Sequence, residues 1–303
     1  MTAQISYDIN SIIIVCEQEG QTVFLLYFLR CVFPTEWIET MTRDRKYKIL
    51  YKAAYDYLES KIGKDALERK LNHYRRYKVD NLYDVFWHLL SSLTNKAGMR
   101  ATIGDIDPLE HFLFDFDPGK CHNHYGGNWR LLFETINRHH QPPGPMNIKN
   151  DGSYWVIFCK AILSGAEFLS RFESFAALDE FVNGFGFNDI AVAGLPILLE
   201  REIYGMGFPL ACDWLKEMGY GNYAKPDTHT IDILHGTNVV RSRGIYDVFN
   251  SLLRIARSNH ELPSVVDRVL WLIGSGKYVG ENEKITRQKA AFIRQLRPIL
   301  NPK

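Results

Sequence analysis

Apolar residues recur along most of this chain at intervals of three and four, which place them on one face of an α-helix. The clearest helical stretches are residues 47–62, 82–93, 252–256, 265–273 and 288–296. The last should stop short of Pro298, because the residue before a proline disfavours helical backbone angles. Alternation with a period of two is scarce, and Val23–Phe33 leaves a strand and a buried helix both open. The pattern predicts a mainly α fold.

The segment between residues 98 and 152 breaks this pattern. It is rich in Gly, Pro, Asp, Asn and His, the residues that favour turns and loops. We interpret it as loops around one helix, Trp129–Asn137. The change near residues 95–105 predicts an N-terminal helical region at 1–98, of unknown role, and a larger helical domain at 99–303.

The most informative stretch runs from Leu195 to Leu234. An apolar helix over Leu195–Ile203 precedes Gly205-Met206-Gly207, and a second amphipathic helix follows that Gly219 would end. The hairpin glycines allow positive φ angles and a close approach of the backbone to a ligand. Amide groups at the start of the second helix favour an anion, and a DNA phosphate is our hypothesis for it.

The run Lys225-Pro226-Asp227-Thr228-His229 follows a few residues after Gly219. Pro226 fixes the backbone just ahead of Asp227, and the apolar residues Ile231, Ile233 and Leu234 predict a further buried helix that begins here. Asp227 should therefore lie at or near a helix N-terminus, where the helix dipole favours a carboxylate.

The Gly-Met-Gly turn, the Leu-Ala pair behind it and the Pro-Asp-Thr-His run some twenty residues later resemble the helix-hairpin-helix DNA glycosylase superfamily (HhH-GPD). Residues Tyr154–Phe172 faintly resemble an earlier core helix of that superfamily. The resemblance implies a helical glycosylase core, with Gly205 and Gly207 in the hairpin. It also implies that Asp227 is the catalytic aspartate, that His229 is the histidine two residues after it, and that duplex DNA with a flipped nucleotide is the partner.

The resemblance implies cleavage of the N-glycosidic bond of a damaged or modified base. Asp227 would stabilise the positive charge of the oxocarbenium-like transition state and would position or deprotonate the attacking water. Contacts to DNA are expected from Gly205, Gly207, Phe208, Lys225 and His229. A flipped base also needs a pocket. Its candidate residues are Trp129, Tyr154 and Trp155, although aromatic side chains more often belong to the core.

The type of chemistry depends on Pro209. Bifunctional members of the superfamily carry a lysine two residues past the second hairpin glycine, and Pro209 stands there in this chain. A monofunctional hydrolase without lyase activity is therefore expected. Lys225 could be a displaced amine nucleophile, but a phosphate contact or pairing with Asp227 is the simpler interpretation.

No cofactor is expected. Iron–sulfur members of the superfamily have four closely spaced C-terminal cysteines, whereas this chain has no cysteine after Cys212. The histidines at positions 122, 124, 139 and 140 do not have the spacing of a familiar zinc site. We therefore predict neither a metal nor an iron–sulfur cluster.

Composition changes the picture mainly through local charge. The net charge of the 303 residues is +1, yet residues 41–80 hold 12 Lys and Arg against 6 Asp and Glu, and residues 241–303 hold 12 against 5. Such surpluses provide either a phosphate-facing surface or solvated helical faces.

Cysteine usage and hydropathy bear on location. Five scattered cysteines favour a reduced, intracellular setting, either cytoplasmic or nucleoid-associated. The first residues lack a basic secretory region, and no apolar run reaches the roughly 20 residues of a membrane span. The sequence leaves the oligomeric state open.

Two other functions remain open at this point. The protein could be a non-catalytic helix-hairpin-helix DNA-binding protein in which Asp227 is only a helix cap. It could also be an N-glycosidase that acts on RNA or on nucleosides.

Overall fold

The computed structural model describes residues 4–8, 11–15, 35–279, 284–285 and 287–301. Helices dominate these residues, and the strands among them form two short antiparallel pairs. The predicted mainly α fold is therefore confirmed. The segment Val23–Phe33 lies outside the described residues.

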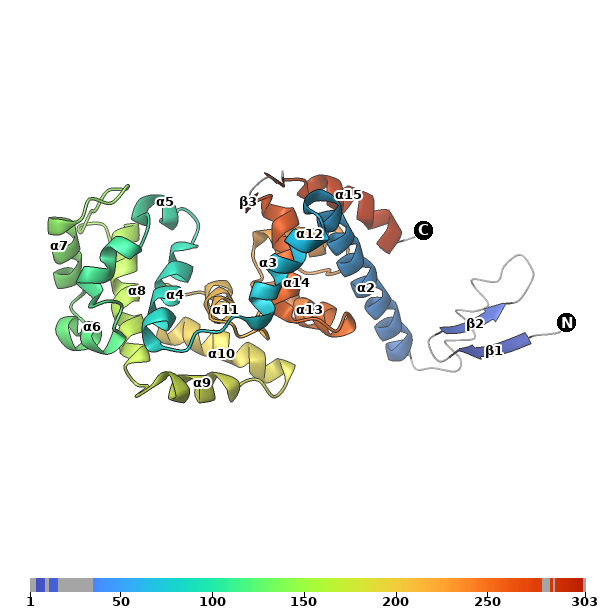
Figure 1. Ribbon diagram of the computed structural model, residues 1–303, viewed down its shortest axis with the longest axis horizontal. Helices are drawn as coiled ribbons and strands as arrows, with labels where there is room; N and C mark the ends of the chain where they lie inside the picture. The colour runs from blue at the N-terminus through green and yellow to red at the C-terminus, as the bar shows by residue number, and fades with distance from the viewer. Residues whose placement is uncertain (1–3, 9–10, 16–34, 280–283, 286, 302–303) are drawn as a thin grey trace.

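In chain order (Figure 1) the elements are β1 (Gln4–Asp8), β2 (Ser11–Val15), α2 (Thr35–Ile62), α3 (Lys64–Arg76), α4 (Leu82–Thr94), α5 (Met99–Ile103), the 3-10 helix η1 (Asp107–Leu113), α6 (Pro118–Tyr125), α7 (Trp129–His139), α8 (Tyr154–Leu169), α9 (Phe175–Asn183), α10 (Asp189–Glu202), α11 (Phe208–Glu217), α12 (Thr228–Gly236), α13 (Ile245–Ser258), α14 (Pro263–Ser275), β3 (Tyr278–Val279), β4 (Lys284–Ile285) and α15 (Lys289–Leu300).

The buried apolar side chains form two clusters, and each organises one lobe. The first lobe consists of α4 to α11 with η1, and the second consists of α2, α3 and α12 to α15 (Figure 1). Phe249 and Leu253 of α13 belong to the first cluster, so this helix packs against both. After β1 and β2, the chain therefore runs through α2 and α3 of the second lobe, forms the first lobe, and returns to the second after residue 223. The predicted division at residues 98 and 99 stays a prediction, although α2 and α3 pack against C-terminal helices.

The end of α11, where the chain passes from the first lobe back to the second, packs against the connection between α3 and α4. The amide of Val79 donates a hydrogen bond to the carbonyl of Met218 at 3.1 Å. Gly219 follows with φ of +96°, and a Cβ there would overlap the carbonyl oxygen of Tyr77. Glycine is required by both constraints, so the predicted helix end at this residue has a physical basis.

Residues 98–152 contain more helix than the sequence indicated. Besides α7, the segment holds α5, η1 and α6. At α6 the Asp117 side chain accepts a hydrogen bond from the amide of Lys120 at 2.9 Å, and Pro118 occupies the first turn. Proline and aspartate are favourable there because the first-turn amides have no partner within the helix. These residues mark a helix start, so our interpretation of them as loop was wrong.

Two helix boundaries also differ from expectation. α10 starts at Asp189, six residues before the predicted Leu195, with Asn188 capping its first turn. α15 continues through Pro298 to Leu300. Phe292, Leu296 and Leu300 are all buried, and this apolar face holds the last turn in place despite the proline.

None of the helices in the described ranges is long and apolar enough to cross a bilayer.

Candidate functional site

The glycine hairpin joins α10 to α11 and rests on α8. The amide of Tyr204 donates a hydrogen bond to the Ser164 hydroxyl at 2.9 Å. Gly205 has φ of +74°, and a Cβ there would approach the Ile157 side chain at 3.2 Å. Gly207 is extended, with φ of −102°, and a Cβ there would meet nothing nearer than Pro209 Cδ at 3.8 Å. Only Gly205 therefore needs the left-handed conformation that was expected of both.

The N-terminus of α11 presents two backbone amides without an acceptor. In the described part of the chain, the N–H groups of Gly207 and Phe208 have no hydrogen-bond partner. Pro209 has no N–H, and the amide of Leu210 already donates to the carbonyl of Gly207 at 2.8 Å. Because the helix dipole adds to these two donors, the turn is suited to an anion.

Phe208 was predicted as a DNA contact, and its side chain does not fit that role. The ring is only 8% exposed and packs edge-on against Phe249, with 5.2 Å between the ring centroids. An aromatic ring buried against a second-lobe helix stabilises the junction of the lobes instead. Only the backbone amide of this residue remains available to a ligand.

An aromatic and cationic cluster lies beside the hairpin, and sequence analysis missed most of it. The Lys160 ammonium lies 4.8 Å from the Trp129 ring centroid and 5.5 Å from that of Tyr204. The Arg130 guanidinium lies 4.4 Å from the Trp129 centroid. Cations held over partly exposed aromatic rings are suited to a nucleic-acid strand. No local signal marks Lys160, because α7, α8 and the hairpin meet only in the tertiary structure.

The three predicted base-pocket residues do not share one surface. Trp155 is 0% exposed and lies within the core of the first lobe, so it cannot line an open pocket. The Tyr154 hydroxyl donates to the carbonyl of Ala97 at 2.9 Å, and its ring lies against Gly98. Only Trp129 keeps a partly exposed ring in the cluster near the hairpin.

Asp227 is the N-cap of α12, as expected. Its Oδ1 accepts hydrogen bonds from the amides of His229 at 2.8 Å and Thr230 at 2.9 Å. The other oxygen, Oδ2, has no hydrogen-bond partner among the residues that the structure describes, and the side chain is partly exposed. One oxygen therefore fixes the carboxylate to the helix, while the second is available to solvent or a ligand.

His229 lies in the first turn of α12 and is half-buried against α14. A Cβ on Gly274 would come within 2.5 Å of the His229 Cβ, so the two helices approach closely here. Burial lowers the pKa of the imidazole, although the charge of Asp227 opposes this shift. The ring is therefore mainly neutral at pH 7. The structure places His229 next to Asp227, and its contact with DNA stays a prediction.

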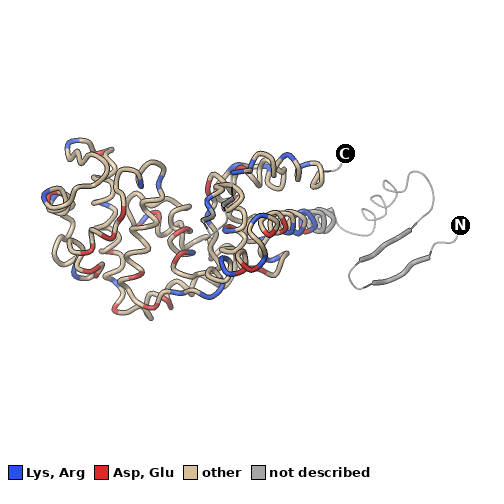
Figure 2. Tube along the Cα trace, turned by 45° about the horizontal axis from the view of Figure 1, so that its top comes forward, with Lys and Arg blue, Asp and Glu red and all other residues tan. Residues whose placement is uncertain are grey.

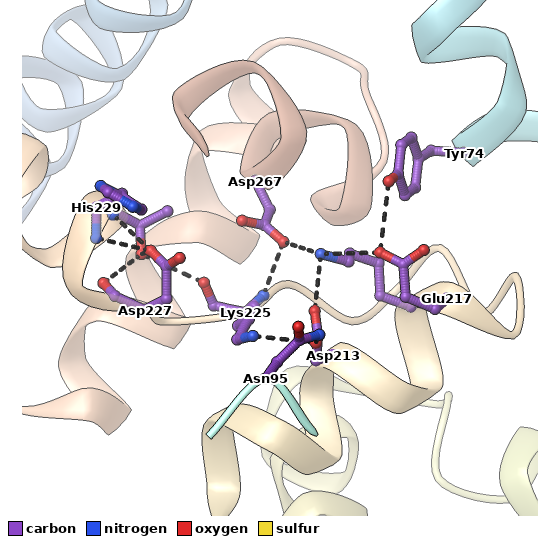
Figure 3. Close-up of polar contacts among 10 residues, drawn as sticks. Tyr74, Asn95, Asp213, Glu217, Lys225, Asp227, His229 and Asp267 are labelled. Carbon is purple, nitrogen blue, oxygen red and sulfur yellow. Dashed lines mark hydrogen bonds and ion pairs between the residues drawn. The ribbon is translucent and has the colours of Figure 1, made fainter. Parts of the chain in front are cut away.

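A buried ion cluster lies beside Asp227 (Figure 3). The Lys216 ammonium is 2.8 Å from Asp267 Oδ2 and 3.3 Å from Asp213 Oδ1. Lys225 adds two contacts, since its ammonium lies 3.0 Å from Asp213 Oδ2 and its amide donates to Asp267 Oδ2 at 3.1 Å. Asn95 donates a further hydrogen bond to Asp213 at 2.8 Å. Lys225 therefore pairs with Asp213, and not with Asp227 as one reading of the sequence had it.

The charges of the cluster depend on one another. Burial opposes ionisation of Asp213, but Lys216 and Lys225 outweigh it and hold the pKa of this carboxyl below its usual value. Burial also opposes the charge of Lys216, yet Asp267 and Asp213 raise its pKa well above the ordinary range. For Asp267, burial raises the pKa and Lys216 only partly offsets that effect. The lysine is thus a fixed cation that holds two carboxyl groups together.

No three His, Cys, Asp or Glu side chains gather as metal ligands within the described ranges. Cys121, Cys159 and Cys212 are buried free thiols. The expectation that the protein needs no cofactor stays a prediction.

Comparison with known proteins gives a likeness in structure only. No family model matches the chain, and no curated protein matches its sequence. The crystal structure of the 8-oxoguanine DNA glycosylase of Methanocaldococcus jannaschii is similar, with a TM-score of 0.51, 16% identity, and coverage of 78% of this chain and 99% of that chain. The 8-oxoguanine glycosylase/lyase of the same organism in complex with a 15mer DNA gives a TM-score of 0.49, 17% identity, and coverage of 76% and 99%. The first likeness confirms the fold that the hairpin motif implied.

We predict that Lys216→Met lowers the free energy of unfolding by about 3–5 kcal/mol, because it removes the shared cation from two buried carboxyl groups. Denaturant unfolding followed by circular dichroism measures this change. Lys52→Met is the matched control, since Lys52 pairs with Asp56 at side-chain exposures of 76% and 51%. The control should change stability by less than about 1 kcal/mol. Equally small effects of both substitutions would contradict a structural role for the cluster.

Proposed function

We propose that this protein is a DNA glycosylase that hydrolyses the N-glycosidic bond of a damaged or modified base. The observation that carries the proposal is the geometry of Asp227. One carboxylate oxygen caps α12 through two backbone amides, while the other has no partner among the described residues. Because the carboxylate is already held in place, the site needs little reorganisation when positive charge develops beside it.

Asp227 would act on the sugar of a flipped nucleotide. Cleavage of the glycosidic bond builds positive charge on the ring, and a fixed carboxylate stabilises the transition state more than the ground state. Its unpartnered oxygen is also suited to accept a proton from the attacking water. The leaving base takes its electron pair from the broken bond, and the hydroxyl of the water completes the abasic sugar.

The hairpin would bind the DNA backbone. Its two unpartnered amides at the start of α11 are suited to one phosphate. The cluster of Lys160, Trp129 and Tyr204 extends the surface beside the turn with aromatic faces for bases. The Lys160 ammonium pairs with the exposed Asp151 at 3.2 Å, and a DNA phosphate would have to replace this partner. Stacking on such faces contributes about 1–3 kcal/mol per base, which offsets part of the cost of flipping a nucleotide.

Residues 209 and 225 are the two positions considered for an amine nucleophile, and the residue at each favours a hydrolytic reaction over a lyase reaction. Pro209 occupies the place of the usual lysine and carries no amine. The Lys225 ammonium is engaged by the buried carboxylate of Asp213 at 3.0 Å, which holds it away from the position of a nucleophile beside Asp227. Water is therefore our proposed nucleophile.

The substrate is best sought with a panel of modified duplexes and mass spectrometry of the released base. A duplex with 8-oxoguanine belongs in the panel, because the similar crystal structure is that of an 8-oxoguanine DNA glycosylase. RNA and free nucleosides test the alternative N-glycosidase. Binding to duplex DNA without release of any base from the panel would instead support a non-catalytic binding protein.

Asp227→Asn should lower single-turnover base release by about 10²–10³-fold, because the amide cannot stabilise the cationic sugar electrostatically. Asparagine is an equally good N-cap, so the fold and the affinity for DNA should be retained. Quench-flow assays and fluorescence anisotropy measure the two quantities. Base release at the wild-type rate would overturn the catalytic assignment.

Gly207→Leu should weaken DNA binding on the order of tenfold, because its side chain would cover the amides that we assign to a phosphate contact. The space around this residue is open within the protein, so stability should change little. Anisotropy titrations at several salt concentrations test binding, and denaturant unfolding is the control. An affinity that stays unchanged at every salt concentration would count against the hairpin contact.

Borohydride treatment during reaction with a substrate or abasic duplex should trap no covalent protein–DNA adduct. With the base-containing substrate, a trapped adduct would mean that an amine had displaced the base at C1′ and formed a Schiff base. On an abasic duplex the amine would instead condense with the C1′ aldehyde and release water. Loss of such an adduct in Lys225→Met, but not in the exposed Lys149→Met control, would identify Lys225 as the nucleophile. That outcome would replace the hydrolytic mechanism by a lyase mechanism.

A further inference from the structure

A basic cleft opens in the second lobe, away from the start of α12. Its volume is about 620 Å³, and its lining comes from α2, from the connection between α12 and α13, and from α13. A second hollow of about 430 Å³ shares Lys46, Asn238, Val240 and Arg241 with it and extends to Asn301. We call the two together the α2–α13 cleft. Asp227 begins α12, whereas the cleft lies past its other end.

The cleft brings together the two basic segments that the sequence singled out. Arg43 and Lys46 come from residues 41–80, and Arg241 and Arg254 come from residues 241–303. Asp247 is the acidic residue in the lining of the larger hollow, so its lining has a formal surplus of three positive charges. Figure 2 shows how Lys and Arg, in blue, spread along the helices of this lobe. The surplus is therefore gathered on a concave surface as well as on solvated faces.

Two arginines of the cleft, Arg241 and Arg254, differ from neighbouring arginines outside it. Arg243 pairs with Asp232 at 2.6 Å, and Arg257 pairs with Asp189 at 2.6 Å. Arg241 and Arg254 have no carboxylate within salt-bridge distance among the described residues. The charges of Arg241 and Arg254 are thus not offset by an ion pair, and with the surplus of basic residues in the lining they attract anions.

Lys46 is held in the cleft by a neutral partner. Its ammonium donates to Asn301 Oδ1 at 2.9 Å, and the Asn301 amide donates to the carbonyl of Thr237 at 2.9 Å. Asparagine fixes the position of the ammonium without neutralising its charge. The cation is therefore preorganised for a further acceptor, which lowers the entropic cost of binding one.

We propose that the α2–α13 cleft binds backbone phosphates of duplex DNA that flanks the nucleotide at Asp227. α12 has nine residues and spans about 13 Å at a rise of 1.5 Å per residue, so the cleft lies a short distance along the molecule from the proposed catalytic carboxylate. Arginines suit phosphodiester oxygens, because the guanidinium can donate two parallel hydrogen bonds to them. The inference rests on the proposed DNA binding and is independent of base release.

The test uses the full-length protein and an unmodified 30-base-pair duplex. The double variant Arg241→Gln/Arg254→Gln should bind this duplex on the order of tenfold more weakly near 0.15 M salt. Because each lost phosphate contact lowers the slope of log K against log salt by about 0.9, the slope should fall by about 1.8. Arg243→Gln/Arg257→Gln is the matched control, as both of its arginines already have carboxylate partners. Its slope should stay that of the wild type.

The outcomes separate this inference from the proposed function. An unchanged slope in the cleft variant, or an equal fall in the control, overturns the cleft proposal. If Gly207→Leu weakens binding while the cleft variant does not, the proposed hairpin contact stands and the cleft proposal fails. If no substrate loses its base but the cleft variant lowers the salt slope as expected, the cleft proposal stands and the proposed glycosylase function fails.

A second measurement titrates inorganic phosphate into the protein by calorimetry at constant ionic strength. Loss of phosphate binding in the cleft variant, with DNA affinity unchanged, shows a small-anion site and also overturns the proposal.

Discussion

The buried cation of Lys216 is the interaction on which the arrangement of this protein depends. It lies between Asp213 on the same helix and Asp267 on α14, which belong to different lobes. Removing a charge from water is costly, and the cost is offset only when good partners surround it. Lys225 joins the cluster through both its ammonium and its backbone amide. The same ions therefore tie the two lobes together and fix the chain immediately before Asp227.

Helix α11 connects the two features that we assign to DNA. It begins at the hairpin, where two amides have no acceptor among the described residues, and it carries Asp213 and Lys216 further along its length. Helix α11 consequently fixes the position of the hairpin directly and that of the Asp227 carboxylate through the ion cluster. This explains how the loop at residues 218–227, which joins α11 to α12, can hold a proposed catalytic group in place. A helix that starts at Asp227 then leads from the proposed catalytic site to the α2–α13 cleft.

The cleft exists only because the fold brings basic residues from distant segments together. The two basic stretches, separated by the 160 residues of 81–240, are ordinary in composition, and each is compatible with a solvated face. They become a candidate site because α2 packs against α13 and leaves Arg241 and Arg254 without carboxylate partners among the described residues. The neighbouring Arg243 and Arg257, which have such partners, show that proximity in sequence does not decide this.

The sequence by itself determined the helical class, the hairpin and the N-cap position of Asp227. Those features rest on local physics: apolar periodicity, the freedom of glycine at residue 205, and a carboxylate that satisfies the first amides of its own helix. Helix starts at Asp117-Pro118 and the continuation through Pro298 were misjudged, because the same residues also favour turns or helix ends. Only the tertiary structure decided that Trp155 and the Phe208 ring are buried, that Lys225 pairs with Asp213, and that Lys160 lies beside the hairpin. These outcomes depend on which distant side chains share a low-dielectric interior or one surface, and no spacing along the chain encodes that.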